Sequence, residues 1–446
     1  MEFRKLFLIF TTLIIASTVS TVSVAQETPV TDLKAELVRL KQAYDSEIAA
    51  MTARINDLEK KNAVKEATLP QEPVAQSGAS NSATAFNPKI GIIFNGGYSR
   101  FSNSTGHYAT EGSPLSGVSD PGPRGFAVGE TEFSFSANVN DLFHAQAAVS
   151  LDAADGSVSL EEGFLETLAL PAGATVKAGR FFSAIGYLNE QHAHKDNFVD
   201  RPMPYLAFLG GQYGDDGVQI SFVMPTDLYM QVGAGAFRGA SFPAGGADNK
   251  GVGAFTGFLR LGGDVGFSNS WRFGLSFLHA NSSHRVTGDI TDPQADVLNF
   301  TGNTDLQIAD FKYQWSPYGN TVDRSFVLQG EYLRRSRNGT FNDIPFDGTD
   351  TGFYVEGVYK FMHGWRAGYR YSALNPNDAV PVSLRGKLLG DAGINPNNHS
   401  FMIDWARNEF SLLRVQFSTE QSQFNRDNRI YLRYIMSIGA HGAHSF

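Results

Sequence analysis

From Pro88 to the end of the chain, apolar and polar residues alternate in short segments that are separated by turn residues. A period of two places successive side chains on opposite faces of a β-strand. The last segment shows this clearly, because Ile430, Leu432 and Tyr434 share one phase whereas Arg433 and Ser437 share the other. Counting these segments gives about sixteen strands, each with one apolar and one polar face. The alternation therefore predicts an all-β domain over residues 88–446.

The polar phase separates a membrane barrel from its main alternative, a large soluble β-sandwich. A sandwich would point its aromatic rows into a packed core. Here the opposite phase of many strands carries charge, as at Glu132, Glu331 and Arg370, and short connections alternate with long ones. Both features are typical of a barrel with short turns at one rim and long loops at the other. We expect a closed antiparallel transmembrane β-barrel, and about sixteen strands would leave a water-filled interior.

The first 25 residues have a different character. They begin with Arg4 and Lys5, continue through an apolar run from Leu6 to Ile15 and end at the small residues Ser23-Val24-Ala25. This is the pattern of a cleaved secretory signal peptide, and the apolar run is too short for the alternative, a single membrane anchor. We expect residues 1–25 to be removed and the mature chain to reach the outer membrane of a Gram-negative cell.

Residues 31–62 lack Gly and Pro and space their apolar residues three or four apart, at Leu33, Leu37, Leu40, Tyr44, Ile48, Met51, Ile55 and Leu58. This heptad pattern predicts a short α-helical coiled coil that self-associates. A helix lying on the barrel, or a lone helix of marginal stability, are the alternatives. Residues 63–87, rich in Pro, Ser and Ala, are expected to be a linker. An even strand count puts both barrel ends on the periplasmic side, so the coiled coil and the N-terminus are expected there.

Composition removes several classes of function. The chain carries 36 basic and 45 acidic residues, a net charge of −9, which argues against nucleic acid as a partner. It contains no cysteine, so disulfide and thiolate chemistry are excluded. The mean hydropathy of −0.20 and the lack of a second long apolar run exclude a helical membrane protein. Nothing matches a nucleophile elbow, and we expect neither enzymatic activity nor a cofactor.

Three features resemble known outer-membrane proteins. Phe446 closes an alternating strand, which resembles the assembly signal of bacterial outer-membrane barrels, and the segments GETEFSFSANVNDLFHAQAAVSL and GRFFSAIGYLNEQHAHKDNF resemble the porin superfamily that includes phosphate-selective porins. The resemblance implies passive diffusion of small hydrophilic solutes or ions, a homotrimer, and a loop from Ser183 to Asp216 folded into the lumen. A TonB-dependent receptor would need about twenty-two strands and a plug, for which the chain has no room.

The charged positions suggest how such a lumen would work. Arg366 and Arg370 share a face of one strand, and Arg414 and Arg433 occupy the corresponding face of the last two. The pore-lining candidates are these four arginines together with Glu132, Glu190, Asp196 and Asp200. Loop carboxylates opposite a basic wall would create a transverse field across a narrow aqueous gap; local pairing of the charges is the alternative. Because acids interleave with the basic residues, we do not expect the dense Arg and Lys ladder of a phosphate-selective pore.

His192 and His194 lie two residues apart in the long loop, with Glu190 and Asp196 beside them. Imidazole and carboxylate groups are common zinc ligands, so the pair is a candidate metal site, although polar loop histidines without a metal are the alternative. A second pair, His441 and His444, is expected at the periplasmic rim and apart from the first. Zinc uptake is accordingly an alternative function. A structural tether between the outer membrane and peptidoglycan, through residues 31–62, is another.

Overall fold

The computed structural model describes residues 88–103, 122–129, 131–153, 156–245, 249, 251–287, 298–376, 395–422 and 426–439, together with Arg39, Gln42 and Ser46. The chain divides into two compact units, Met1–Ser82 and Ala83–Phe446. In the first unit the described residues Arg39, Gln42 and Ser46 are helical and exposed. The rest of the expected coiled coil lies outside the described residues, as do the expected signal peptide, the linker and the pair His441 and His444.

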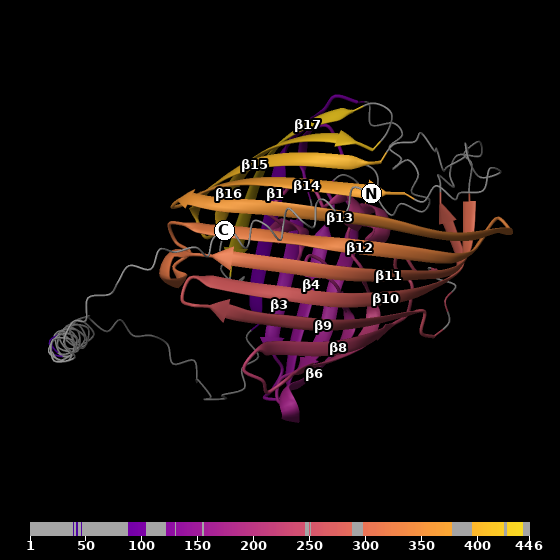
Figure 1. Ribbon diagram of the computed structural model, residues 1–446, viewed down its shortest axis with the longest axis horizontal. Coiled ribbons are helices and arrows are strands. Elements are labelled where there is room, and N and C mark those ends of the chain that lie inside the picture. The colour runs from indigo at the N-terminus through magenta and orange to yellow at the C-terminus, as the bar shows by residue number, and fades with distance from the viewer. Residues whose placement is uncertain are drawn as a thin grey trace, which may run out of the picture. The chain divides into compact units, whose positions relative to one another are not determined.

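The second unit is a closed antiparallel β-barrel (Figure 1). Its strands are β1 (Lys89–Phe101), β2 (Gly125–Val128), β3 (Thr131–Asn138), β4 (Phe143–Leu151), β5 (Val158–Thr167), β6 (Ala174–Phe182), β7 (Gly214–Val223), β8 (Tyr229–Phe237), β9 (Ala254–Val265), β10 (Asn269–Thr287), β11 (Leu298–Trp315), β12 (Ser325–Phe341), β13 (Ile344–Met362), β14 (Trp365–Asn375), β15 (Asn397–Asn408), β16 (Ser411–Gln421) and β17 (Asp427–Gly439). From β3 to β17 each strand pairs with the next along the chain, and β1 pairs with β17 from Gly91↔Gly439 to Phe101↔Arg429, which closes the ring.

The strand count agrees with the alternation in the sequence. The sheet has 17 strands, of which β2 is the extra one, so 16 form the ring. β1 pairs with β3 over Lys89–Ile93 and with β2 over Gly96–Ser99. β2 therefore continues the line of β3 along β1. The predicted closed barrel of about sixteen strands is confirmed.

Side chains alternate between the two faces of the barrel as the sequence predicts. On β13, Phe353, Val355 and Tyr359 are 38%, 46% and 41% exposed on the outer face, whereas Tyr354 and Glu356 on the inner face are 0% and 3% exposed. The same alternation runs along the described part of the last strand, where Ile430 and Leu432 face outward and Arg429 and Tyr431 inward. The outer surface is therefore an apolar belt.

Strands β10 to β13 are longer than the alternating segments in the sequence, with 17 to 19 residues each. A strand needs only about 9–11 residues to cross a bilayer. On the outer face of β12 the apolar residues Phe326, Leu328 and Tyr332 give way to Arg334 and Ser336. The apolar belt ends at that point, and the sheet continues beyond it into a polar environment.

The connections differ at the two rims. Tight turns such as His363-Gly364, between β13 and β14, lie at the rim where β1 begins and β17 ends; we call this the short-turn rim. The opposite rim carries the longer connections, including residues 183–213 between β6 and β7. The expected loop from Ser183 to Asp216 is thus slightly too long, because β7 already begins at Gly214. Among the described residues, no helix is both long and apolar enough to cross a bilayer.

Candidate functional site

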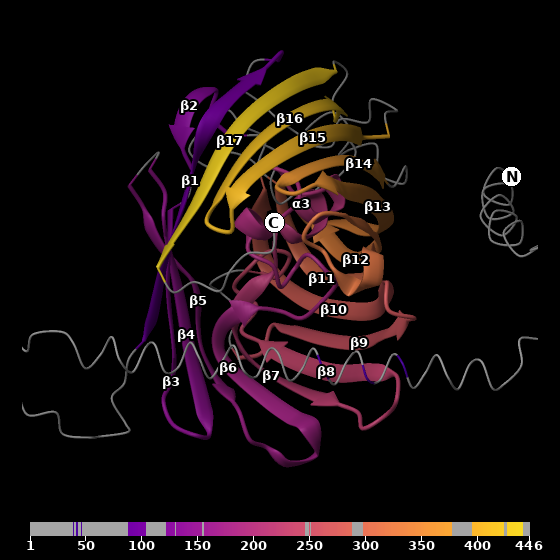
Figure 2. The same ribbon diagram turned by 90° about the vertical axis from the view of Figure 1, so that its left-hand side faces the viewer.

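The connection between β6 and β7, residues 183–213, folds into the barrel and is called the inner loop below. It contains the 3-10 turn η2 (Ala193–Lys195) and helix α3 (Met203–Leu209), and Figure 2 shows α3 inside the ring of strands. Its backbone N–H groups donate to inward side chains of distant strands: Leu188 to Glu331 of β12 at 3.0 Å, and Val199 to Gln416 of β16 at 2.7 Å. The inner loop therefore crosses the lumen and is held by the walls.

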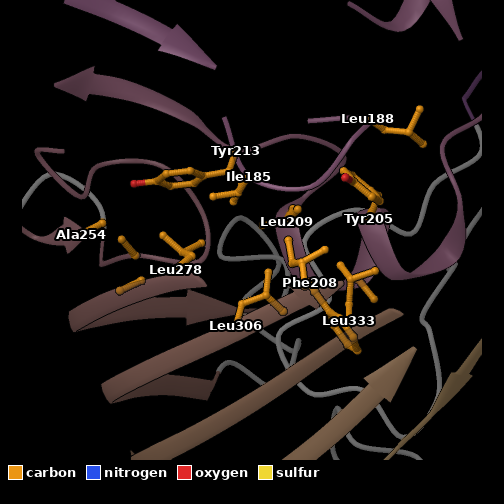
Figure 3. Packing of buried hydrophobic residues seen from close by; sticks show 14 of the residues in the cluster. Ile185, Leu188, Tyr205, Phe208, Leu209, Tyr213, Ala254, Leu278, Leu306 and Leu333 are labelled. Atoms are coloured by element: carbon orange, nitrogen blue, oxygen red, sulfur yellow. The ribbon is translucent and has the colours of Figure 1, made fainter. Parts of the chain in front are cut away.

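Apolar side chains anchor one side of the inner loop. Ile185, Phe208 and Leu209 are each at most 1% exposed and pack in one cluster with Leu306 and Leu333 of the wall (Figure 3). Burial of a large apolar side chain stabilises a fold by about 1.5–3 kcal/mol. This cluster fills part of the barrel interior with apolar side chains, whereas the strand count predicted a water-filled interior. The apolar composition of α3, MPYLAFL, is the signal that could have indicated it.

Glu331 is the main polar anchor of the inner loop. Its carboxylate is 3% exposed and accepts hydrogen bonds from the backbone N–H groups of Tyr187 (3.1 Å) and Leu188 (3.0 Å). It also accepts from the hydroxyls of Tyr205 (2.9 Å) and Tyr354 (2.8 Å). Four donors converge on one buried acid. The sequence placed Glu331 on the polar face of its strand but gave no reason to single it out.

Three of the four arginines expected to form a basic wall, Arg366, Arg370 and Arg414, make ion pairs. Asp404 lies between two arginines, 2.5 Å from Arg366 and 2.9 Å from Arg414. Arg370 contacts the carboxylate of Asp200 in the inner loop at 2.8 Å. Arg414 also donates to a backbone oxygen of the inner loop, at Asp196. Arg370 and Arg414 of the wall therefore bind the inner loop directly.

Arg433 is the fourth arginine of the predicted wall, and its contacts differ from those of the other three. Its backbone lies opposite that of Arg414 in the pairing of β16 with β17, and its guanidinium lies 5.9 Å from the ring centre of Tyr431. It remains partly exposed. Arg433 therefore faces the lumen beside the ion pairs.

The loop carboxylates pair locally with basic side chains, which is one of the two arrangements that the charge pattern left open. Asp196 is 6% exposed and 2.7 Å from Arg201 of the same loop. Glu190 pairs with Arg260 of β9, on another side of the barrel. With Asp200 bonded to Arg370, the opposite charges pair locally, because the inner loop lies against the wall instead of standing off it.

Glu132 belongs to a different group from the arginine wall. Its carboxylate, on β3, lies 3.1 Å from Nδ1 of His192 and 3.2 Å from Nδ1 of His194. All three side chains are at most 9% exposed, and Glu161 and Glu162 of β5 lie 3.1 and 3.0 Å from the ring of His192. Their spacing in the sequence, with Glu132 and the two glutamates 30 to 60 residues before the histidines, gave no sign of this meeting.

The ionisation of the two imidazoles differs. Burial lowers the pKa of His192, but hydrogen bonds to Glu132, Glu161 and Glu162 outweigh it and raise the pKa to about 11. For His194, burial dominates and lowers the pKa below its usual value. The surroundings thus shift the pKa values of two neighbouring rings in opposite directions.

The part of the inner wall that remains in contact with water is mainly basic. Six basic side chains point inward and are only partly buried; we call them the basic lining, namely Lys177, Arg272, Lys312, Lys360, Arg366 and Arg433. The acids on the same strands are covered, since Asp310, Glu356 and Asp404 are 2%, 3% and 0% exposed. A polar cavity of about 160 Å³, lined by Lys177, Glu166, Gln219, Gln231 and Arg260 among others, opens beside the inner loop.

A closed ring of sixteen strands, with an apolar outer belt and a loop folded into a polar interior, defines a barrel of the porin type. No family model matches the chain. An uncharacterized protein of Aquifex aeolicus (strain VF5) is 29% identical over 346 residues, covering 72% of this chain and 70% of that protein.

Two solved structures have a similar fold. In vitro folded OmpT, an outer membrane protein of Vibrio cholerae, has a TM-score of 0.51 at 10% identity and covers 81% of this chain and 100% of its own. An anion-selective porin from Comamonas acidovorans has a TM-score of 0.50 at 10% identity and covers 79% of this chain and 100% of its own. At these identities the likeness concerns the fold, which this chain shares with outer-membrane channels.

Proposed function

We propose that this protein is an outer-membrane porin that lets small hydrophilic solutes and ions diffuse passively through its barrel. The observation that carries the proposal is the combination of two surfaces on one closed sheet. The outer belt exposes large apolar side chains such as Phe277 (41%), Val355 (46%) and Phe401 (53%), which only a lipid environment accommodates over such an area. The inner surface is charged and polar, as an aqueous path requires.

The basic lining supports a modest preference for anions. Positive side chains that water reaches raise the local concentration of anions, whereas acids that are buried in ion pairs act on the lumen more weakly. Glu166 and Glu190 remain partly exposed and oppose this effect, so the preference is small. The mixed charges give no support for a dedicated phosphate site.

Single-channel recording in planar bilayers, with a KCl gradient, tests both statements. We expect discrete conductance steps and a reversal potential of the sign produced by chloride. Lys360→Gln combined with Arg433→Gln should shift that potential toward the cation side. The matched control is Arg334→Gln, since Arg334 is exposed on the outer face of β12 and its loss should leave the potential unchanged. If folded protein gives no conductance steps, the proposal that it is a porin is wrong. If the reversal potential is the same in all variants, the basic lining does not set the ion preference.

We propose in addition that the short-turn rim faces the periplasm and that residues 31–62 assemble three barrels through a coiled coil. The heptad pattern supports this, together with the start of β1 and the end of β17 at the same rim. Deletion of residues 31–62 should convert a detergent-solubilised trimer to smaller species in light scattering. An oligomer of unchanged number would show that the helix does not set assembly.

A further inference from the structure

The cluster of Glu132, His192 and His194 has the geometry of a metal site. One ligand atom from each of the three side chains lies within 4.8 Å of the other two. Nδ1 of His192 and Nδ1 of His194 are 3.1 and 3.2 Å from the same oxygen of Glu132. In a tetrahedral zinc site with bonds of about 2.0–2.1 Å, neighbouring ligand atoms are about 3.3 Å apart. Two of the three distances between ligand atoms are therefore close to the spacing that an ion between them would impose.

The local fold fixes these side chains. His192 directly precedes the 3-10 turn η2 and His194 lies within it, and both rings contact Glu132 of β3, stacked with their centres 5.5 Å apart. A second set of groups orients the first, as in many metal sites. Nε2 of His192 contacts Glu162 at 3.0 Å, and Glu162 in turn accepts the backbone N–H of Phe182 at 3.2 Å. These contacts hold the buried side chains of the cluster in fixed orientations.

The choice of partners also points to a cation. Several other acids inside the barrel contact arginine, as Asp404 does at Arg414 and Asp200 at Arg370. Here three carboxylates, Glu132, Glu161 and Glu162, converge on imidazole rings. Imidazole can exchange a proton for a metal ion, which arginine cannot do.

The site has room and access. A small cavity of about 70 Å³ is lined by Glu132, Glu161 and His194 together with Asn95 and Gln212. Glu161 Oε2 lies 3.1 Å from Nδ1 of His192, beside the three ligands. Nitrogen with carboxylate oxygen suits zinc and its neighbours, whereas calcium and magnesium prefer oxygen alone.

We propose that Glu132, His192 and His194 bind a divalent transition-metal ion, with zinc preferred over calcium and magnesium, and that the ion ties the inner loop to β3. The inner loop is already held by Glu331 of β12, far around the ring from β3. The metal ion would attach the opposite side of the inner loop to β3. This site is independent of whether solutes pass, so binding can be measured without any transport assay.

The test uses the full chain in detergent, freed of metal by a chelator and then titrated calorimetrically with ZnCl2. We expect one ion per chain and no heat with CaCl2 or MgCl2. Titration with CoCl2 should give the intense visible absorption of tetrahedral cobalt. His194→Gln should weaken zinc binding at least about 100-fold, and Glu162→Gln, which keeps every ligand, about 10–100-fold.

His279→Gln is the matched control, because His279 also contacts a carboxylate, that of Asp305 at 2.6 Å, but among the described residues it belongs to no cluster of three. Its zinc affinity should equal that of the unmodified protein. The shift of the folded band on unheated gels shows that each variant is still a closed barrel. Two results overturn the proposal: no heat and no cobalt spectrum with the unmodified folded protein, or equal affinity in His194→Gln and His279→Gln.

Discussion

Replacement of Glu331 by glutamine should loosen the inner loop without opening the barrel. The carboxylate accepts four hydrogen bonds, from the N–H groups of Tyr187 and Leu188 and the hydroxyls of Tyr205 and Tyr354. The glutamine oxygen can keep about two of these donors, whereas its amide nitrogen cannot accept, so about two buried donors lose their partner. At roughly 1–3 kcal/mol for each, the attachment of the inner loop weakens by about 3 kcal/mol. The population of the detached loop then rises about 100-fold.

Hydrogen–deuterium exchange measured by mass spectrometry reports this directly, because the N–H groups of Tyr187 and Leu188 exchange only when the inner loop detaches. Peptides from residues 183–213 should exchange about 100-fold faster in Glu331→Gln, and peptides from β15 and β16 at an unchanged rate. Gln329→Ala is the control on the same face of β12, since the amide nitrogen of Gln329 has no hydrogen-bond partner in the described structure. Exchange of the inner loop within about threefold of the unmodified rate would refute the anchoring role.

Two further substitutions test the packing of the inner loop and the lipid-facing belt. Gly186→Ala should displace the inner loop, because Gly186 has a φ of +64° and a Cβ there would collide with Glu331 and lie 2.6 Å from the Tyr205 hydroxyl. Hydrogen–deuterium exchange over residues 183–213 should then be faster. An unchanged exchange rate would contradict this expectation. Val355→Arg, on the outer face of β13, should lower the free energy of unfolding from lipid vesicles by about 2–4 kcal/mol. An arginine at Asn338, which is exposed beyond the belt, should lower the free energy of unfolding by less than about 1 kcal/mol. An equal decrease for the two variants would show that the apolar belt is not the part of the barrel that lies in the membrane.

The strands of the barrel could be predicted from the sequence because each strand needs only a local alternation. All segments counted from the alternation correspond to strands of the ring, and inward positions such as Glu356 and Arg370 lie where their phase places them. The long ends of β10 to β13 could not be predicted, since beyond the apolar belt both faces are polar and the period disappears. β2 was missed for a similar reason, as its four residues are too few to show a period.

The arrangement of the inner loop was less accessible. Its place in the chain and several of its charged residues were predicted, but the partners of those residues depend on contacts between positions far apart in the sequence. Glu331 and Tyr205 are 126 residues apart, and Arg414 and the Asp196 oxygen 218. The contact of His192 with Glu132 likewise depends on the inner loop folding back against β5 and β3, which are separated from it in the sequence. No local pattern in the sequence indicates contacts between residues that are so far apart along the chain.

The central claim is that one closed sheet has lipid outside and water inside. The chain has no cysteine of its own, so single cysteines can be placed along β11 from Phe311 to Trp315 and compared directly. In vesicles, cysteines at Phe311, Tyr313 and Trp315 should resist a water-soluble thiol reagent and carry labels that lipid-soluble agents quench. Cysteines at Lys312 and Gln314 should react through the lumen. Uniform reactivity along the strand, or quenching at Lys312 and Gln314, would contradict the account.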